Sequence, residues 1–121
     1  MSAASWIGLA VLGGVGAALR FAVDSAIGRR AATLFPLGTF VINMSGSFVL
    51  GVLASAAVGS ATLFVVGTGL IGSYTTFSTW MFESEQLAGD REYLLAIANL
   101  AVSVLAGLGF AVAGWELGGV L

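Results

Sequence analysis

The chain has 121 residues, of which 59% are apolar and 8% are charged, whereas an average soluble domain carries about 25% charged residues. Histidine, cysteine and lysine are absent, which excludes disulfides, imidazole or thiolate metal sites, and a basic run that could bind nucleic acid. No charged side chain occurs over residues 1–19, 31–82 and 93–115. At roughly 20 residues per crossing, these stretches predict one, two and one transmembrane helices. We therefore expect an all-α integral membrane protein in a single four-helix domain, with no room for an enzymatic domain.

The first two predicted spans cover residues 5–27 and 36–57. The first carries Arg20 and Asp24 one helical turn apart, a spacing at which the two charges can neutralise each other. Pro36 opens the second span, since proline is tolerated in a first helical turn. A short turn around residues 58–62 follows.

The third predicted span covers residues 63–82 and has an unusually polar centre. Glycine and threonine weaken a helix, and they crowd the segment from Gly67 to Trp80. We expect the helix to break between Gly72 and Thr75. Backbone freed at such a break must be buried or line a wet cavity, where its carbonyls can hold a small cation and its amides can face an anion. A polar loop from Glu83 to Glu92 is expected next.

The fourth predicted span covers residues 93–117, and its polar residues form a stripe like one on the second span. Small polar residues and glycine recur every four positions on both helices, at Thr39, Asn43, Ser47 and Gly51 and at Asn99, Ser103 and Gly107. Single residues of this kind usually bond a neighbouring helix. Two matching stripes in one small protein instead favour a hydrated path. The 18 glycines indicate close helix packing, and the Gly114 and Gly118 pair is interpreted in the same way.

The predicted path is rich in hydrogen-bond donors and poor in carboxylates. Its donors are neutral amides and hydroxyls, and one aromatic ring offers a positively polarised edge. The path has neither a lysine nor a mid-span carboxylate, so a proton-coupled carrier lacks a proton site. These features favour passive conduction of a small anion. The residues are Asn43, Phe77, Ser78, Thr79, Asn99 and Ser103.

Three motifs in this order resemble the CrcB/Fluc fluoride channels. They are the glycine-rich run from Gly13 to Arg20, the run from Gly38 to Asn43 with Gly46, and Gly72 followed by Thr-Thr-Phe-Ser-Thr at residues 75–79. The resemblance extends over essentially the whole chain. It implies an antiparallel dual-topology dimer with two fluoride pathways along the subunit interface and a structural sodium ion at its centre.

The resemblance also implies roles for individual residues. Asn43 would be the pore-lining amide and Phe77 the ring whose edge contacts fluoride. The backbone carbonyls of Gly72 and Thr75 would bind sodium. Ser103 and Asn99 would belong to a polar track on the fourth helix, although several members of the family have tyrosine at the position of Asn99. Glu83 would lie at the pore mouth, and Arg20 is expected to have a structural role.

One residue departs from the family pattern. The family has a second phenylalanine three residues after the first, where this chain has Trp80. At this spacing Trp80 shares a helical face with Phe77, and its indole can offer a polarised edge or an N–H donor. Its ring is larger than that of phenylalanine, which bears on the second anion position and on the conduction rate.

Arginines are distributed unevenly among the loops. Arg29 and Arg30 follow the first span and Arg91 follows the third, whereas the termini and the second loop have none. This bias predicts termini on the outside, while a dual-topology homodimer needs little bias. A homodimer is favoured over a heterodimer with an oppositely oriented homologue. We expect a fluoride channel in a prokaryotic plasma membrane that relieves fluoride toxicity. The alternatives are a four-span multidrug or organic cation exporter and an assembly subunit without transport activity.

Overall fold

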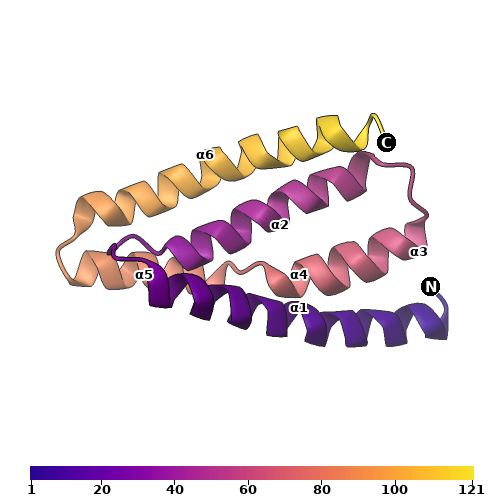
Figure 1. The fold of residues 1–121 in the computed structure, drawn as a ribbon, viewed down its shortest axis with the longest axis horizontal. Coiled ribbons are helices and arrows are strands. Elements are labelled where there is room, and N and C mark those ends of the chain that lie inside the picture. Colours follow the sequence, from indigo (N-terminus) through magenta and orange to yellow (C-terminus); the bar gives the residue numbers. More distant parts are fainter.

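The computed structural model describes residues 1–121 and contains helices only. Three helices are long and apolar enough to cross a membrane, namely α1 (Ala3–Arg30), α2 (Leu37–Ser55) and α6 (Tyr93–Gly118). Between α2 and α6 the chain makes one interrupted crossing (Figure 1). Its parts are α3 (Ser60–Thr62), the π-helix η1 (Leu63–Ile71), α4 (Gly72–Tyr74) and the start of α5 (Ser78–Gly89). The rest of α5, from Glu83 on, carries charge and lies beyond the uncharged segment.

The four crossings form two packed pairs. Helix α2 lies along α6, and α1 lies along η1 and α4. Both termini and the turn between α2 and α3 lie at one end of the bundle (Figure 1). The connection between α1 and α2 and the turn between α5 and α6 lie at the other end, here called the loop end. Three arginines, Arg29, Arg30 and Arg91, belong to the loop end.

Glycines bring α2 and α6 into close contact, which confirms their predicted role in packing. A Cβ atom on Gly114 would collide with the Phe48 carbonyl, and one on Gly51 would collide with the Ala111 carbonyl. Gly118 lies against Val52 in the same way. Because lipid provides no hydrophobic drive between helices, such backbone proximity is needed for dispersion contacts.

The second packed pair depends on glycine as well. A Cβ atom on Gly16 of α1 would collide with the Leu70 carbonyl and the Ser73 hydroxyl. A Cβ on Gly69 would lie 3.1 Å from the Leu9 carbonyl oxygen. Most of the partner segment, η1, is π-helical, and π-helical turns are frequently found at functional sites. This pair holds the interrupted crossing in place up to the point where it breaks.

The predicted ends of the first, second and fourth spans lie within three residues of α1, α2 and α6. The prediction of a polar loop over residues 83–92 is wrong, because α5 continues to Gly89 and leaves only a short turn. Residues 83–88 include Glu, Gln, Leu and Ala, which favour helix. The helix ends where Arg91 adopts a left-handed conformation, with φ of 60°.

The third crossing breaks as expected, but slightly later than predicted. Residues 75–77 lie outside any helix. Thr75 is the last residue to continue the helical pattern, because its N–H still donates to the Ile71 carbonyl at 3.0 Å. The next N–H, that of Thr76, leaves the helix for a side chain on α2.

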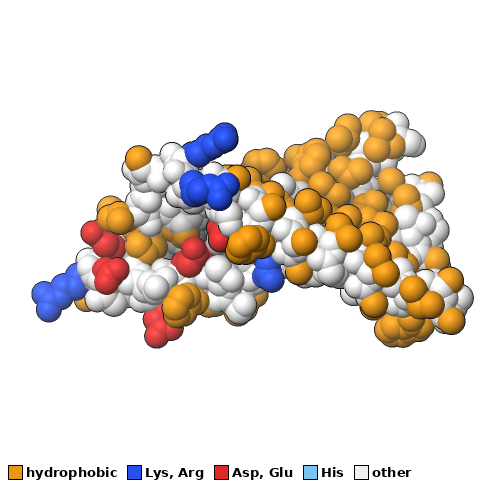
Figure 2. Space-filling model, turned by 60° about the horizontal axis from the view of Figure 1, so that its bottom comes forward, with side chains coloured by type: hydrophobic (Ala, Val, Ile, Leu, Met, Phe, Trp, Pro, Cys, Tyr) orange, Lys and Arg blue, Asp and Glu red, His pale blue; other side chains and the backbone are white.

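The surface is largely apolar, as befits a membrane protein. Only 18 of 121 residues are buried, so most large hydrophobic side chains face outward. On the face shown in Figure 2, charged side chains gather toward the loop end, while hydrophobic side chains predominate toward the other end. A single chain therefore has little core of its own and relies on lipid or another subunit to cover its apolar faces.

Candidate functional site

The site begins at the break in the third crossing, where Asn43 of α2 replaces the missing helical hydrogen bonds. Its Oδ1 atom accepts from the Thr76 N–H at 2.9 Å, and its Nδ2 atom donates to the Thr76 carbonyl at 2.9 Å. The amide thus mimics a backbone partner for the residue at the centre of the break. One Nδ2 hydrogen remains without a partner in the chain and is available to a ligand.

Next to this bridge lies a cavity of about 350 Å³, here called the central cavity. It contains no charged side chain. The polar stripes of α2 and α6 meet there, since Asn43 and Ser47 line it from one side and Ser103 and Gly107 from the other. The prediction that the two stripes face one path is consistent with this arrangement. The other lining residues are Met44, Thr75, Thr76, Phe77, Trp80, Val104 and Leu108.

Two aromatic rings form part of the wall of the central cavity. Phe77 and Trp80 lie edge to face, with ring centroids 5.6 Å apart and an interplanar angle of 80°. Phe77 is 69% exposed although it lies at the centre of a crossing. Phe77 precedes the first residue of α5, so the break itself turns this ring outward.

The indole N–H of Trp80 is already used. It donates to the backbone carbonyl of Asn99 on α6 at 3.0 Å. The side chain of Asn99 is 1% exposed, and its Nδ2 atom donates to the Ser84 hydroxyl at 2.8 Å. Ser103 donates to Asn99 Oδ1 over a longer distance of 3.4 Å. Asn99 therefore lies behind the wall of the central cavity, whereas Ser103 is part of that wall.

Sequence reasoning missed Ser84, which joins α5 to α6. Its hydroxyl is 6% exposed and donates to the Trp80 carbonyl at 2.8 Å while accepting from Asn99. The available signal was its spacing, because Ser84 lies one helical turn after Trp80. The assumption of a loop from residue 83 concealed that spacing.

Ser78 and Thr79, also predicted along the path, lie apart from the central cavity. Ser78 is exposed at the start of α5 and does not line the cavity. Thr79 lines a second cavity of about 180 Å³, the side cavity, together with Arg20 and Asp24. No ion pair joins Arg20 to Asp24, so the two charges share this cavity without direct neutralisation.

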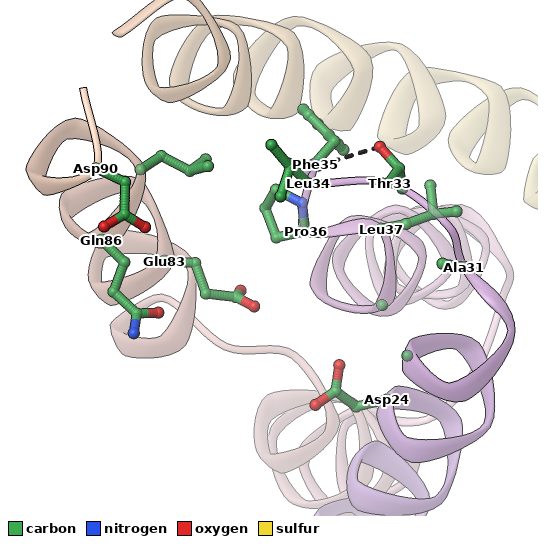
Figure 3. A pocket seen from close by; sticks show the side chains of 13 residues that line it. Asp24, Ala31, Thr33, Leu34, Phe35, Pro36, Leu37, Glu83, Gln86 and Asp90 are labelled. Carbon is green, nitrogen blue, oxygen red and sulfur yellow. Dashed lines mark hydrogen bonds between the residues drawn. The ribbon is translucent and has the colours of Figure 1, made fainter. Parts of the chain in front are cut away.

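A third cavity, of about 330 Å³, opens at the loop end between α5 and the start of α2 (Figure 3). Glu83, one residue beyond the predicted third span, points into it, and Asp24 faces the same space from α1 (Figure 3). Burial raises the pKa of the Glu83 carboxyl, the nearby Thr39 hydroxyl opposes this change, and the negative charge of Asp24 adds to it. Neither Glu83 Oε1 nor the buried Thr39 hydroxyl makes a well-formed hydrogen bond.

The backbone carbonyls at the break fit a small hard cation. The carbonyl oxygens of Gly72 and Thr75 accept no hydrogen bond, because Thr76 N–H is bound to Asn43 and Thr79 N–H is bound to the Thr76 hydroxyl. Unwound carbonyls of this kind coordinate Na⁺ in membrane proteins. No group of three acidic, histidine or cysteine side chains could hold a metal ion.

Comparison with known proteins identifies the relatives of this chain. Residues 7–115 match the family described as CrcB-like protein, Camphor Resistance (CrcB). The chain is 47% identical over 114 residues to Fluoride-specific ion channel FluC 2 of Mycolicibacterium paratuberculosis, covering 94% of this chain and 93% of the relative. It is 41% identical over 118 residues to Fluoride-specific ion channel FluC 1 of Leifsonia xyli, covering 94% and 86%. Fluoride-specific ion channel FluC 2 of Clostridium acetobutylicum is 35% identical over 99 residues, covering 81% and 85%.

Proposed function

The chain belongs to the CrcB/FluC family of ion channels, and on that premise we propose that it conducts fluoride passively out of the cell across the plasma membrane. The family consists of channels and not of enzymes. The observation that carries the proposal is the central cavity, which is uncharged and lined by an amide, hydroxyls and aromatic rings.

The chemistry of the central cavity suits a small anion. The free Nδ2 hydrogen of Asn43 and the Ser103 hydroxyl supply neutral donors, and Phe77 adds a positively polarised ring edge. Fluoride is small and accepts strong hydrogen bonds, so a narrow ring of donors replaces its water better than that of chloride. We assign the conduction path to this cavity, with Asn43, Phe77, Trp80 and Ser103 along it. Ser78 and Thr79 lie outside the central cavity on α5 and are proposed to contact the anion only beyond it, and Asn99 supports the cavity wall from behind.

Conduction without coupling follows from the absence of a titratable group in the central cavity. A carrier that exchanges protons for organic cations needs a carboxylate within the membrane. Asp24 is exposed near the end of α1, where it faces the loop-end cavity. The organic cation exporter therefore receives no support. Glu83 lies at the mouth of the proposed path, and Arg20 contributes to structure at the side cavity.

We propose that two chains form an antiparallel dimer. Phe77 is mostly exposed on a single chain, and the apolar faces of the bundle remain largely uncovered. A second chain would enclose the open side of the central cavity and complete two equivalent paths. The concentration of arginine at the loop end favours one orientation, so an oppositely oriented homologue is the alternative partner to a second copy.

A sodium ion at the dimer centre is part of the same proposal. The carbonyl oxygens of Gly72 and Thr75 have no hydrogen-bond partner, and two chains would supply four such oxygens. Bound there, the ion would neutralise carbonyl dipoles that the break leaves unpaired. Its role is structural, since the central cavity supplies the anion contacts.

Physiologically, the channel would serve fluoride resistance in a bacterium. Hydrogen fluoride crosses lipid as a neutral molecule and dissociates in the more alkaline cytoplasm, where the anion is trapped. A passive pore releases the trapped anion down its electrochemical gradient without an energy source.

The test is efflux from liposomes that contain only the purified protein and potassium fluoride. Valinomycin starts the efflux, and an electrode follows external fluoride. Liposomes loaded with potassium chloride provide the matched control. Fast fluoride loss without chloride loss is the expected result.

Cross-linking in the same liposomes establishes the oligomeric state and orientation. Absence of fluoride loss from a protein shown to be dimeric would overturn the proposal. Equal loss of chloride would exclude a fluoride-selective channel.

A further inference from the structure

We propose that Ser84 and Asn99 are positioning residues that fix the Trp80 ring in the wall of the central cavity, so that Trp80 meets the anion through carbon-bound hydrogens only. This inference rests on the proposed fluoride path. It assigns a function to Ser84, which the sequence analysis did not single out. It also specifies which atoms of the Trp80 ring contact the anion.

The indole ring of Trp80 has a single polar atom, its nitrogen Nε1. Trp80 lines the central cavity, but its Nε1–H donates to the Asn99 carbonyl at 3.0 Å, and that residue does not line the cavity. Indole nitrogen is a donor with a single hydrogen. The part of the ring that faces the cavity therefore consists of carbon and hydrogen, and its edge is positively polarised.

Hydrogen bonds with Ser84 and Asn99 hold Trp80 in place. Asn99 Nδ2 donates to Ser84 Oγ at 2.8 Å, and Ser84 Oγ donates to the carbonyl of Trp80 at 2.8 Å. A longer contact of 3.5 Å joins Asn99 Nδ2 to the same carbonyl. We call these three residues the Trp80 clamp. It fixes the backbone of Trp80 through Ser84 and the ring through the Asn99 carbonyl.

Ser84 and Asn99, the residues that hold Trp80, are both buried. Asn99 is 1% exposed and Ser84 is 6% exposed, so water does not replace a lost bond in the clamp. A buried polar group that loses its partner is unfavourable, which makes the clamped arrangement the preferred one. Both polar atoms of the Asn99 side chain have partners within the chain. Asn99 therefore has no unoccupied polar atom that points to direct contact with an anion.

A fixed ring determines the width of the path beside Phe77. The two rings lie edge to face with their centroids 5.6 Å apart, and the Phe77 ring itself carries no hydrogen-bonding atom. The clamp thus anchors the pair through Trp80 alone. Loosening the clamp would widen the path and admit chloride.

The first measurement is hydrogen exchange of the indole N–H groups in ¹⁵N-labelled protein. The chain has three tryptophans, so three indole signals are expected. Trp80→Phe identifies the Trp80 signal by its disappearance. If that variant does not fold, Trp6→Phe and Trp115→Phe identify the remaining signal by elimination.

In the native protein, the Trp80 indole signal is expected to exchange slowly and to stay unchanged when sodium fluoride replaces sodium chloride. Ser84→Ala should raise its exchange rate about five- to tenfold, in line with the loss of a neutral hydrogen bond. A fluoride-specific shift of this signal, or an unchanged exchange rate in Ser84→Ala, would overturn the proposal.

Ser55→Ala is the matched control. Ser55 also joins two helices, because its hydroxyl donates to the Trp115 carbonyl on α6 at 2.6 Å. Ser55 is the last residue of α2, and it does not line the central cavity. This variant should leave the Trp80 exchange rate unchanged, and an equal increase would show that Ser84→Ala acts by general loosening and would contradict the clamp.

The second measurement is the ratio of fluoride to chloride efflux in liposomes. Ser84→Ala should lower this ratio about fivefold, while Ser55→Ala keeps the native value. An unchanged ratio would contradict the role of the clamp in selectivity. Indole exchange needs no transport, so a native protein that passes no fluoride but shows the expected exchange pattern would overturn the channel and leave the ring geometry established.

Discussion

The third and fourth crossings both carry polar groups through the membrane, but they solve the problem in different ways. The third crossing exposes its backbone, because the helix breaks over residues 75–77. The fourth crossing, α6, is a continuous helix of 26 residues whose polar groups are side chains.

The partners of the two crossings differ accordingly. At the break, the backbone of Thr76 depends on one amide from α2, that of Asn43. On α6, Asn99 draws on several partners, including Ser84 and Ser103. A broken backbone needs a partner with a donor and an acceptor in one place, whereas polar side chains can share bonds within a cluster. The third crossing should therefore be the more sensitive to a single substitution.

The largest effect is expected from Asn43→Asp, which removes one of the two hydrogen bonds to Thr76 at the break in the third crossing. A carboxylate can still accept from Thr76 N–H, but it cannot donate to the Thr76 carbonyl, and it places negative charge beside the anion path. Two like charges about 4 Å apart repel each other by about 4 kcal/mol at the effective dielectric typical of a protein, so fluoride efflux should fall by at least about a hundredfold. Fluoride efflux from liposomes that contain the variant measures this loss.

Ser60→Asp provides the control, because it adds the same charge on an exposed residue at the start of α3. It should retain native efflux. Undiminished efflux in Asn43→Asp would mean that Asn43 does not line the path.

The next largest effect is expected from Gly114→Val, which tests the close packing of the continuous crossing, α6, on α2. The added side chain meets the Phe48 carbonyl and separates α6 from α2. Overpacking of this kind costs about 1–3 kcal/mol, so the yield of assembled protein and its Tm should fall. Gly109→Val on the same helix has open space around its Cβ and should behave as native. Equal stability of the two variants would contradict the close packing of α2 on α6.

A smaller effect is expected from Ser103→Ala, which removes one donor from the central cavity while α6 remains intact. The hydroxyl makes only a long bond to Asn99, so its loss should cost about 1 kcal/mol and lower fluoride efflux about fivefold. Ser103→Thr retains the hydroxyl and should restore most of the rate. If alanine and threonine give the same rate, the hydroxyl does not contact the anion.

The smallest effect is expected at Glu83, which lies at the mouth of the proposed path. Burial raises the pKa of this carboxyl, so it becomes neutral at a higher pH than an ordinary glutamate. A charged Glu83 repels fluoride, and efflux should therefore rise about twofold as pH falls through this pKa. Glu83→Gln should keep the faster rate of the neutral form at all pH values and should match the native protein only at low pH. The rate from protein-free liposomes is subtracted to remove leakage of hydrogen fluoride.

Glu85→Gln makes the same change of charge on an exposed side chain of α5 and serves as the control. It should keep the native pH dependence. Persistence of that dependence in Glu83→Gln would place the titrating group elsewhere.

Much of the fold could be predicted because a membrane makes burial depend on local composition. Residues without charge over about 20 positions have few alternatives to a spanning helix. A break in the third crossing was also predictable, since glycine and threonine weaken a helix wherever they cluster, although it lies at residues 75–77, slightly later than the predicted segment from Gly72 to Thr75. The extension of α5 to Gly89 was missed, because polarity was taken as a sign of a loop although the residues favour helix.

The candidate site was predictable by residue type but not by the state of each donor. The amide of Asn43 keeps a free hydrogen, while that of Asn99 is committed to Ser84. Both residues look alike in the sequence, as asparagines in polar stripes. Likewise, Trp80 carries an N–H in the sequence, but only its contact with the Asn99 carbonyl shows that this N–H is occupied.

By itself, the sequence determined that this chain spans a membrane, where its apolar crossings lie and which residues bring polar groups into them, because hydropathy and helix propensity act over a few neighbouring residues. The tertiary structure decided which polar groups are free, since a donor is satisfied or available only through partners distant in the chain. Asn43 reaches Thr76 across 33 positions and Trp80 reaches Asn99 across 19. The site is the set of groups that this long-range pairing leaves unpaired.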